Sequence, residues 1–216
     1  MAQGMPQAYR DGSKGFYRRE FTVNEHVLVP RPETEHLIED ALEFMRGSRR
    51  RRVLDVGTGS GAIACTLACE VPDAIVTATD ISAPALAVAE QNAGRLGVTG
   101  RCRFVLADIA PHDAEKYDLL LANLPYIPSK DVPQKPDPVG FEPRVATDGG
   151  ADGLEQYRKL LAAAPDLVLP GALLLMEAAP PTIAGLRALA QGAFPGAAVS
   201  VHRDYAGLDR YVRVAT

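Results

Sequence analysis

No stretch of the 216-residue sequence approaches the roughly 18 consecutive apolar residues of a membrane-spanning helix, and the N-terminus lacks the apolar core of a signal peptide. Only three cysteines occur, too few for a disulfide framework. Cys65 and Cys69 stand one helical turn apart, but no nearby His or third Cys completes a metal site. We therefore expect core cysteines, no bound metal and a reducing cytoplasmic location.

An excess of basic residues is also missing. The sequence has 23 Lys and Arg against 27 Asp and Glu, which gives a net charge of −4 and a pI of about 5.6. A protein whose main partner is nucleic acid usually presents a strongly basic face. The composition therefore makes such a partner an unfavoured hypothesis, while 47% hydrophobic residues supply the core of one sizeable domain.

Strand and helix patterns alternate along the chain. Residues 1–15 are polar and Gly-rich and are expected to be poorly ordered, and residues 16–216 are expected to form a single domain. Residues 16–29 allow one or two short strands, and residues 127–153 form a long loop, which is usually functional or disordered. Further strands are predicted at 52–56, 74–79, 103–106, 116–122, 172–177, 198–203 and 211–215, and helices at 37–45, 62–70, 84–96, 154–167 and 181–191. This alternation predicts an α/β three-layer αβα sandwich whose seven-stranded, mostly parallel sheet has an antiparallel edge strand.

A glycine-rich loop follows the first strand of this sheet. Open α/β sheets bind ligands beyond the carboxyl ends of their strands, and three alternating glycines allow a closer backbone approach than a plain turn requires. The spacing differs from the G-x-G-x-x-G of dinucleotide-binding proteins. A neutral loop beside an acid suits a ligand with an amino-acid end and a cationic centre. The predicted cofactor-binding residues of this segment are Asp55, Gly57, Thr58, Gly59 and Gly61.

Acidic residues also follow the next two strands. Asp80 stands where a carboxylate can accept hydrogen bonds from ribose hydroxyls, and Asp108 stands where an adenine edge can be bound. Each acid alone is equally compatible with a surface or helix-capping role. The ordered set predicts a nucleoside-bearing cofactor, with Ile81, Ile109 and Asn123 as further binding residues.

The strand at 116–122 ends in Asn123-Leu124-Pro125-Tyr126, and these four residues are the predicted catalytic residues. The Asn123 side-chain oxygen and the Leu124 backbone carbonyl can each accept one N–H of a planar –NH2 group. Neutral hydrogen bonds contribute only about 0.5–1.5 kcal/mol each, whereas good alignment contributes ~7–11 kcal/mol. Alignment is therefore the main catalytic effect expected here, with Tyr126 stacked on the acceptor and Pro125 stiffening the turn.

These motifs resemble those of class I S-adenosylmethionine-dependent methyltransferases, and more narrowly those of the HemK/PrmC family, the protein-(glutamine-N5) methyltransferases that modify peptide-chain release factors. The resemblance covers about residues 21–214. Its narrow signals are Arg-Pro-Glu-Thr-Glu at 31–35 and Gly-Gly-Ala-Asp-Gly-Leu at 149–154, with further matches at Val29-Pro30, Asp80-Ile81-Ser82, Glu142-Pro143 and 204–210. It implies S-adenosyl-L-methionine as cofactor and the Gln of a release-factor Gly-Gly-Gln loop as methyl acceptor. The substrate-binding residues it implies are Arg31, Pro32, Glu33, Thr34, Asn123 and Tyr126.

The sequence departs from this family in two places. Leu124 replaces the first Pro of the usual Asn-Pro-Pro-Tyr; it keeps the carbonyl but adds an N–H that needs a partner. Asn-Leu-Pro-Tyr also resembles the motif of ribosomal RNA adenine dimethyltransferases, so adenine-N6 methylation of RNA or DNA is the alternative. The helical N-terminal domain typical of the family has no room before Asp55. We therefore expect either a truncated form, or a short form that recognises its substrate differently or with a partner subunit. A cofactor-binding subunit that is inactive without a partner is a third hypothesis.

Overall fold

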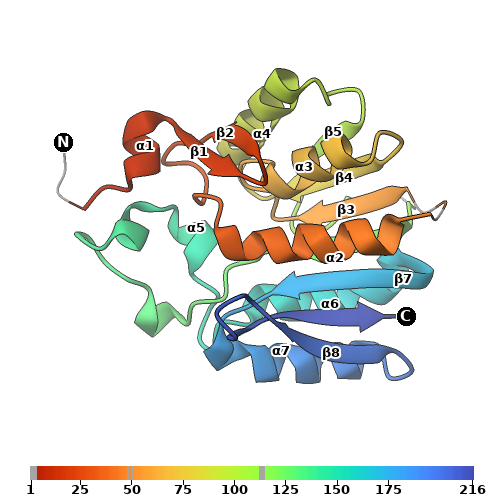
Figure 1. Cartoon of the computed structure of the whole chain (residues 1–216). Helices are drawn as coiled ribbons and strands as arrows, with labels where there is room; N and C mark the ends of the chain where they lie inside the picture. Colours follow the sequence, from red (N-terminus) through yellow and green to blue (C-terminus); the bar gives the residue numbers. More distant parts are fainter. Residues whose placement is uncertain (1–3, 48, 50, 112–114) are drawn as a thin grey trace.

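A seven-stranded sheet forms the centre of the computed structural model, which describes residues 4–47, 49, 51–111 and 115–216 (Figure 1). The strand order is β5-β4-β3-β6-β7-β9-β8. The strands are β3 (Arg52–Val56), β4 (Ile75–Asp80), β5 (Cys102–Leu106), β6 (Tyr117–Ala122), β7 (Val168–Glu177), β8 (Ala198–Arg203) and β9 (Asp209–Ala215). Pairing is parallel from β5 to β7, and β9 is antiparallel to β7 and β8. The predicted α/β sandwich with a mostly parallel sheet is confirmed; its antiparallel strand is β9, next to the edge strand β8.

The central strands are buried on both faces, as their continuous apolar runs predict for a covered parallel sheet. In β6, Leu119 and Leu121 belong to one hydrophobic cluster, while Leu120 and Ala122 belong to the other. Successive side chains of a strand point to opposite faces, so one apolar run supplies both cores.

Helices cover the two faces of the sheet. On one side lie α2 (Glu35–Met45), α3 (Ala62–Glu70) and α4 (Ala83–Leu96), and on the other lie α6 (Glu155–Leu167) and α7 (Pro180–Ala193). None of the helices in the described part of the chain combines the length and apolar character needed to cross a bilayer. Short connections join helices to strands at one end of the sheet, and longer segments of the chain lie at the other end (Figure 1).

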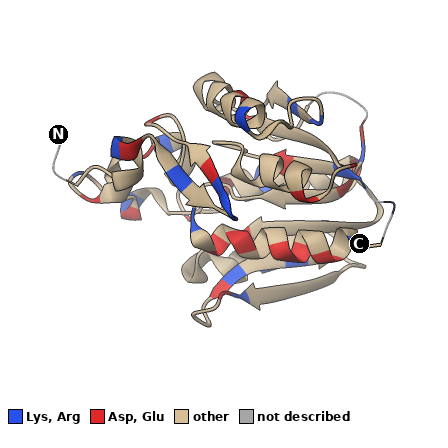
Figure 2. Cartoon of the chain, turned by 45° about the horizontal axis from the view of Figure 1, so that its top comes forward, with Lys and Arg blue, Asp and Glu red and all other residues tan. Residues whose placement is uncertain are grey.

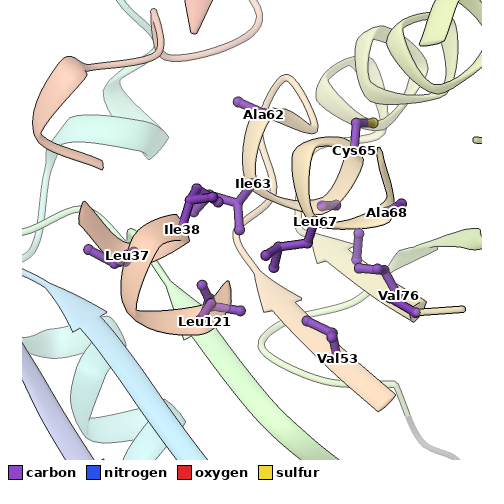
Figure 3. Close-up of a cluster of buried hydrophobic side chains, with 14 of the residues drawn as sticks. Leu37, Ile38, Val53, Ala62, Ile63, Cys65, Leu67, Ala68, Val76 and Leu121 are labelled. Carbon is purple, nitrogen blue, oxygen red and sulfur yellow. The ribbon is translucent and has the colours of Figure 1, made fainter. Parts of the chain in front are cut away.

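Helix α2 shows how the pattern directs this packing. Acidic positions follow one another along its outer side (Figure 2). Its apolar positions face inward, where Ile38 points toward Ile63 of α3 (Figure 3). Leu37 points away from α3 but belongs to the same buried cluster as Leu67 of α3 and Val53 of β3. This spacing of about three to four residues is what places one stripe of a helix against a core.

The expected disorder at the N-terminus is wrong for residues 7–15, because they form helix α1 (Gln7–Asp11) and most of strand β1 (Ser13–Phe16), which pairs with β2 (Arg19–Thr22). Aromatic side chains anchor this polar segment. The Tyr9 hydroxyl donates to the Val27 carbonyl at 2.5 Å, and Phe16 packs edge-on against Phe21 with ring centroids 6.0 Å apart. Residues 1–3 lie outside the described part.

Two further segments differ from the sequence prediction. Strand β7 begins at Val168 rather than 172 and includes Pro170 and Gly171, which were expected to form a separate turn; its pairing with β6 is irregular between Tyr117 and Leu119. The 127–153 loop contains the short helices η2 (Ser129–Asp131), η3 (Pro138–Phe141) and α5 (Arg144–Thr147). It lies with the β1–β2 hairpin at the end of the sheet to which β3 and β7 point (Figure 1).

Candidate active site

A cleft opens at the carboxyl ends of β3, β4 and β6. The chain runs outward from β3 in both directions, through β4 on one side and β6 on the other, and such switch points are where open α/β sheets bind ligands. The predicted site residues that line the cleft are Arg31, Thr34, Gly57, Thr58, Gly59, Asp80, Ile81, Asp108, Ile109, Asn123, Leu124 and Pro125. Those that lie outside its walls are Pro32, Glu33, Asp55, Gly61 and Tyr126.

The glycine loop forms one wall of the cleft. Gly57, Gly59 and Gly61 have φ angles of 73°, 55° and 77°, a left-handed conformation that side chains disfavour. A Cβ on Gly57 would come within 2.8 Å of the Leu124 side chain, whereas one on Gly59 would meet no atom within 4 Å. The loop is thus packed tightly at its start and leaves an open wall at its centre.

Asp55 lies beneath this loop. Its Oδ2 accepts hydrogen bonds from the Thr58 hydroxyl at 2.6 Å and the Ala64 N–H at 3.2 Å, while its Oδ1 has no hydrogen-bond partner among the described residues. Complete burial raises the pKa of Asp55 to about 7, against these two hydrogen bonds. A buried carboxylate with one free oxygen favours a donor or cation nearby.

Asp80 ties the loop to the end of β4. Its two carboxylate oxygens accept from the backbone N–H of Gly59 and of Ser82, each at 2.9 Å. Burial raises the pKa of Asp80, and these hydrogen bonds oppose the shift. A carboxylate fixed from two sides keeps its remaining lone pairs for a ligand in the cleft.

Asp108 and Ile109 stand at the far wall. The Asp108 side chain is half exposed and pairs with Lys159 Nζ at 3.2 Å, a surface contact of small energetic value. Ile109 has φ 76°, which is a strained conformation for a β-branched residue, and the Thr79 hydroxyl donates to its carbonyl at 2.6 Å. Such strain of about 1–3 kcal/mol is typical of ligand-binding segments.

The tetrapeptide closes the third side. Asn123 Nδ2 donates to the Thr34 hydroxyl oxygen at 3.1 Å, and the Leu124 N–H donates to the Tyr157 hydroxyl at 3.1 Å. The extra N–H that Leu124 brings therefore has a partner. Tyr157 is fully buried and donates in turn to the Glu177 carbonyl, so α6 and β7 hold the tetrapeptide from behind.

The Gly-Gly-Ala-Asp-Gly-Leu segment supports the same turn. A Cβ on Gly149 would lie 2.6 Å from the Pro125 carbonyl oxygen, and one on Gly153 would lie 2.4 Å from the Tyr126 carbonyl oxygen. Only glycine allows this backbone-to-backbone approach. This motif is thus a packing surface for the tetrapeptide.

A partly buried ion pair, in which Glu142 is buried and Arg31 is partly exposed, lies at the mouth of the cleft. Arg31 contacts Glu142 Oε2 at 2.5 Å, and Glu142 Oε1 accepts the Val29 N–H at 3.1 Å. Burial raises the pKa of Glu142, and Arg31 lowers it. The pair joins the 29–31 segment to the long loop that follows Tyr126.

Two buried groups of this site were not predicted from the sequence. Glu177 accepts hydrogen bonds from Thr34 and Tyr126, and Tyr157 binds Leu124. A lone acid closing the apolar run 172–176 was a visible signal for Glu177, whereas Tyr157 resembles any core residue of an amphipathic helix. Within the described ranges, no group of three or more His, Cys, Asp or Glu side chains is arranged to hold a metal ion.

Sequence comparison connects this site with known proteins. A family model described as "Methyltransferase small domain" matches residues 35–135. The chain is 43% identical to the release factor glutamine methyltransferase of Moorella thermoacetica over 97% of this chain and 74% of that protein. It is 44% identical to the release factor glutamine methyltransferase of Neisseria gonorrhoeae over 96% of this chain and 75% of that protein.

Solved structures share the fold at lower identity. The 16S rRNA N2 G1207 methyltransferase of T. thermophilus, in complex with AdoMet and guanosine, superposes with a TM-score of 0.66 at 18% identity, over 94% of this chain and 49% of that chain. A SAM-dependent methyltransferase from Agrobacterium tumefaciens gives 0.64 at 16% identity, over 94% and 69%. The sheet described above is thus the class I methyltransferase fold.

Proposed function

The chain belongs to the family of release factor glutamine methyltransferases, and on that premise we propose that it methylates the side-chain nitrogen of the Gln in a release-factor Gly-Gly-Gln loop. It is an S-adenosylmethionine-dependent enzyme. The assignment of this methyl acceptor rests on one observation: the chain is more than 40% identical, over nearly its whole length, to relatives named release factor glutamine methyltransferase. A cytoplasmic location and a partner subunit remain predictions.

The cleft has features that suit the cofactor. The open wall at Gly59 admits a ligand close to the backbone. Asp55 is buried beneath this wall, outside the cleft, and its Oδ1 has no hydrogen-bond partner among the described residues. Asp80 and Asp108 offer carboxylates at successive strand ends for hydroxyl and amine donors. When bound, S-adenosylmethionine supplies a methyl group that is already activated by its sulfonium.

The residues of the tetrapeptide would orient the acceptor. An amide nitrogen is a poor nucleophile because its lone pair is delocalised, as the ~18–20 kcal/mol rotation barrier reflects. Asn123 Oδ1 and the Leu124 carbonyl accept its two N–H groups, which holds the nitrogen in place and favours the positive charge that develops during attack. Tyr126, expected to stack on the acceptor, lies outside the walls of the cleft, and its hydroxyl is 3.4 Å from Glu177. No protein nucleophile is required.

The test is incubation of the purified chain with S-adenosylmethionine and a release factor, followed by peptide mass spectrometry. We expect a mass gain of one methyl group on the Gln of the Gly-Gly-Gln loop, and none in a release factor that carries Ala there. An unmodified Gln, with cofactor binding demonstrated by calorimetry, would refute the proposal. RNA binding that weakens steeply with salt would instead favour the adenine acceptor.

A further inference from the structure

The proposed binding of the acceptor –NH2 group depends on whether the oxygen or the nitrogen of the Asn123 side-chain amide faces it. Only Oδ1 can accept an N–H; a half-turn of the amide would present Nδ2, a donor, to another donor. The two orientations have nearly the same shape, so packing alone does not choose between them. Something behind Asn123 must therefore distinguish oxygen from nitrogen.

A short hydrogen-bond chain behind Asn123 makes this distinction. The Thr34 hydroxyl donates to Glu177 Oε2 at 2.6 Å and accepts from Asn123 Nδ2 at 3.1 Å. Thr34 and Glu177 are 4% and 1% exposed, so water does not compete for these contacts. An ionised carboxylate can only accept, so the single hydroxyl proton of Thr34 is committed to Glu177.

Thr34 then has only lone pairs to offer Asn123, and only the –NH2 end of the amide can bind them. Oδ1 is directed away from Thr34, and no hydrogen bond reaches it from the residues that the structure describes. It is thereby left free for an acceptor in the cleft that Asn123 lines.

We propose that Thr34 and Glu177 are positioning residues that fix the polarity of the Asn123 amide, an inference that rests on the proposed function. Thr34 is the Thr of the Arg-Pro-Glu-Thr-Glu segment and lies in η1 (Pro32–Thr34), and Glu177 is the last residue of β7. These two elements together orient the Asn123 side chain, which directly follows β6. Thr34 was expected from the sequence to bind substrate and lines the cleft; the role proposed here is an effect on Asn123.

The polarity holds only while Glu177 is ionised. Burial raises the pKa of Glu177 to about 7, while Thr34, Arg210 of β9 and Tyr126 lower it and Glu33 of η1 raises it. From α6, the Tyr157 hydroxyl binds the Glu177 backbone carbonyl rather than the carboxylate. A proton on Glu177 can itself be donated to Thr34, which releases the Thr34 proton toward Asn123 and makes both amide orientations possible.

Three variants test the role of Thr34 in turnover. Thr34→Val keeps the shape and removes the hydroxyl, so kcat should fall at least fivefold while KM for S-adenosylmethionine stays within twofold. Thr34→Ser should restore most of that loss. Thr182→Val removes another buried Thr hydroxyl, whose one partner among the described residues is the Ala179 carbonyl, and serves as the matched control. Equal rates for Val and Ser variants at position 34 would overturn the proposal.

A second measurement needs no methyl acceptor. In an NMR titration, the side-chain NH2 signals of Asn123, assigned by their loss in Asn123→Ala, should shift with a midpoint near pH 7. This shift should vanish in Thr34→Val and in Glu177→Gln. If the signals shift as expected but no Gln is methylated, the positioning role stands and the proposed function fails. If the titration persists in both variants, the positioning role fails whatever the acceptor is.

Discussion

At the residue scale, the Asn123 side chain is expected to affect turnover more than cofactor binding. It contacts Thr34 and the cleft, whereas Gly59, Asp80 and Asp108 line the part of the cleft proposed for the cofactor. Asn123→Ala should leave the Kd for S-adenosylmethionine within about threefold and lower kcat about 100-fold, the usual effect of losing one oriented polar group in a site. Calorimetry and mass spectrometry measure the two quantities. Gln191→Ala, an exposed amide on α7, is the control, and full turnover in Asn123→Ala would contradict the assigned role.

The Leu124 N–H makes a second residue-scale prediction. Tyr157→Phe leaves that N–H without its partner, so the free energy of unfolding should fall by about 1–3 kcal/mol. In a Leu124→Pro background no such N–H exists, and the same Tyr157→Phe change should cost about 1 kcal/mol less. Urea unfolding of the four proteins gives the coupling energy. Strict additivity would mean that Leu124 finds another partner when Tyr157 loses its hydroxyl.

Helices and strands were predictable from the sequence where the local pattern of apolar residues and glycines was compatible with only one type of element. Strand β3 and helix α3 have the expected bounds because an apolar run ends in a glycine loop and a helical run follows it. The ordered structure of residues 7–15 could not be predicted in this way, because it depends on contacts with residues distant in the sequence, such as that of Tyr9 with Val27.

The site shows the same division. Asp80 and Asn123 could be placed together because parallel strands end at one edge of the sheet. The hydrogen bond between Thr34 and Glu177 joins residues 143 positions apart, and no local pattern indicates such a pair. Residues that line the cleft are therefore more predictable here than the buried residues that hold them from behind.

The loop after the tetrapeptide provides the element-scale prediction. A Cβ at Gly149 meets the Pro125 carbonyl oxygen at 2.6 Å, so Gly149→Ala must displace backbone rather than a flexible side chain. A displacement of about 1 Å can lower kcat about 100-fold, and overpacking costs roughly 1–3 kcal/mol of stability. Gly192→Ala, in helix α7 with no atom within 4 Å of the new Cβ, should instead gain roughly 0.5–1 kcal/mol. Unchanged turnover in Gly149→Ala would show that the loop does not position the tetrapeptide.

At the scale of the whole molecule, two buried carboxyl groups at one end of the sheet destabilise the folded state when they are ionised. Asp55 at β3 and Glu177 at β7 are both buried, and burial raises the pKa of each to about 7. In the unfolded chain these groups titrate near 4. The folded protein thus binds their protons more tightly, so their contribution to stability is complete below about pH 4 and is lost as pH rises through 7.

Asp55→Asn should reduce this pH dependence. Between pH 5 and pH 8, the free energy of unfolding of the variant should rise relative to that of the native sequence by roughly 2–3 kcal/mol, because the native protein alone must bury the Asp55 charge. Urea unfolding without cofactor at both pH values measures the change, and any pH-independent effect of the new amide cancels in the comparison. Asp166→Asn removes an exposed carboxylate of α6 as the control. Parallel pH profiles for Asp55→Asn and the native sequence would show that Asp55 is ionised at little cost, and that its free oxygen is not a source of binding energy for a cationic ligand.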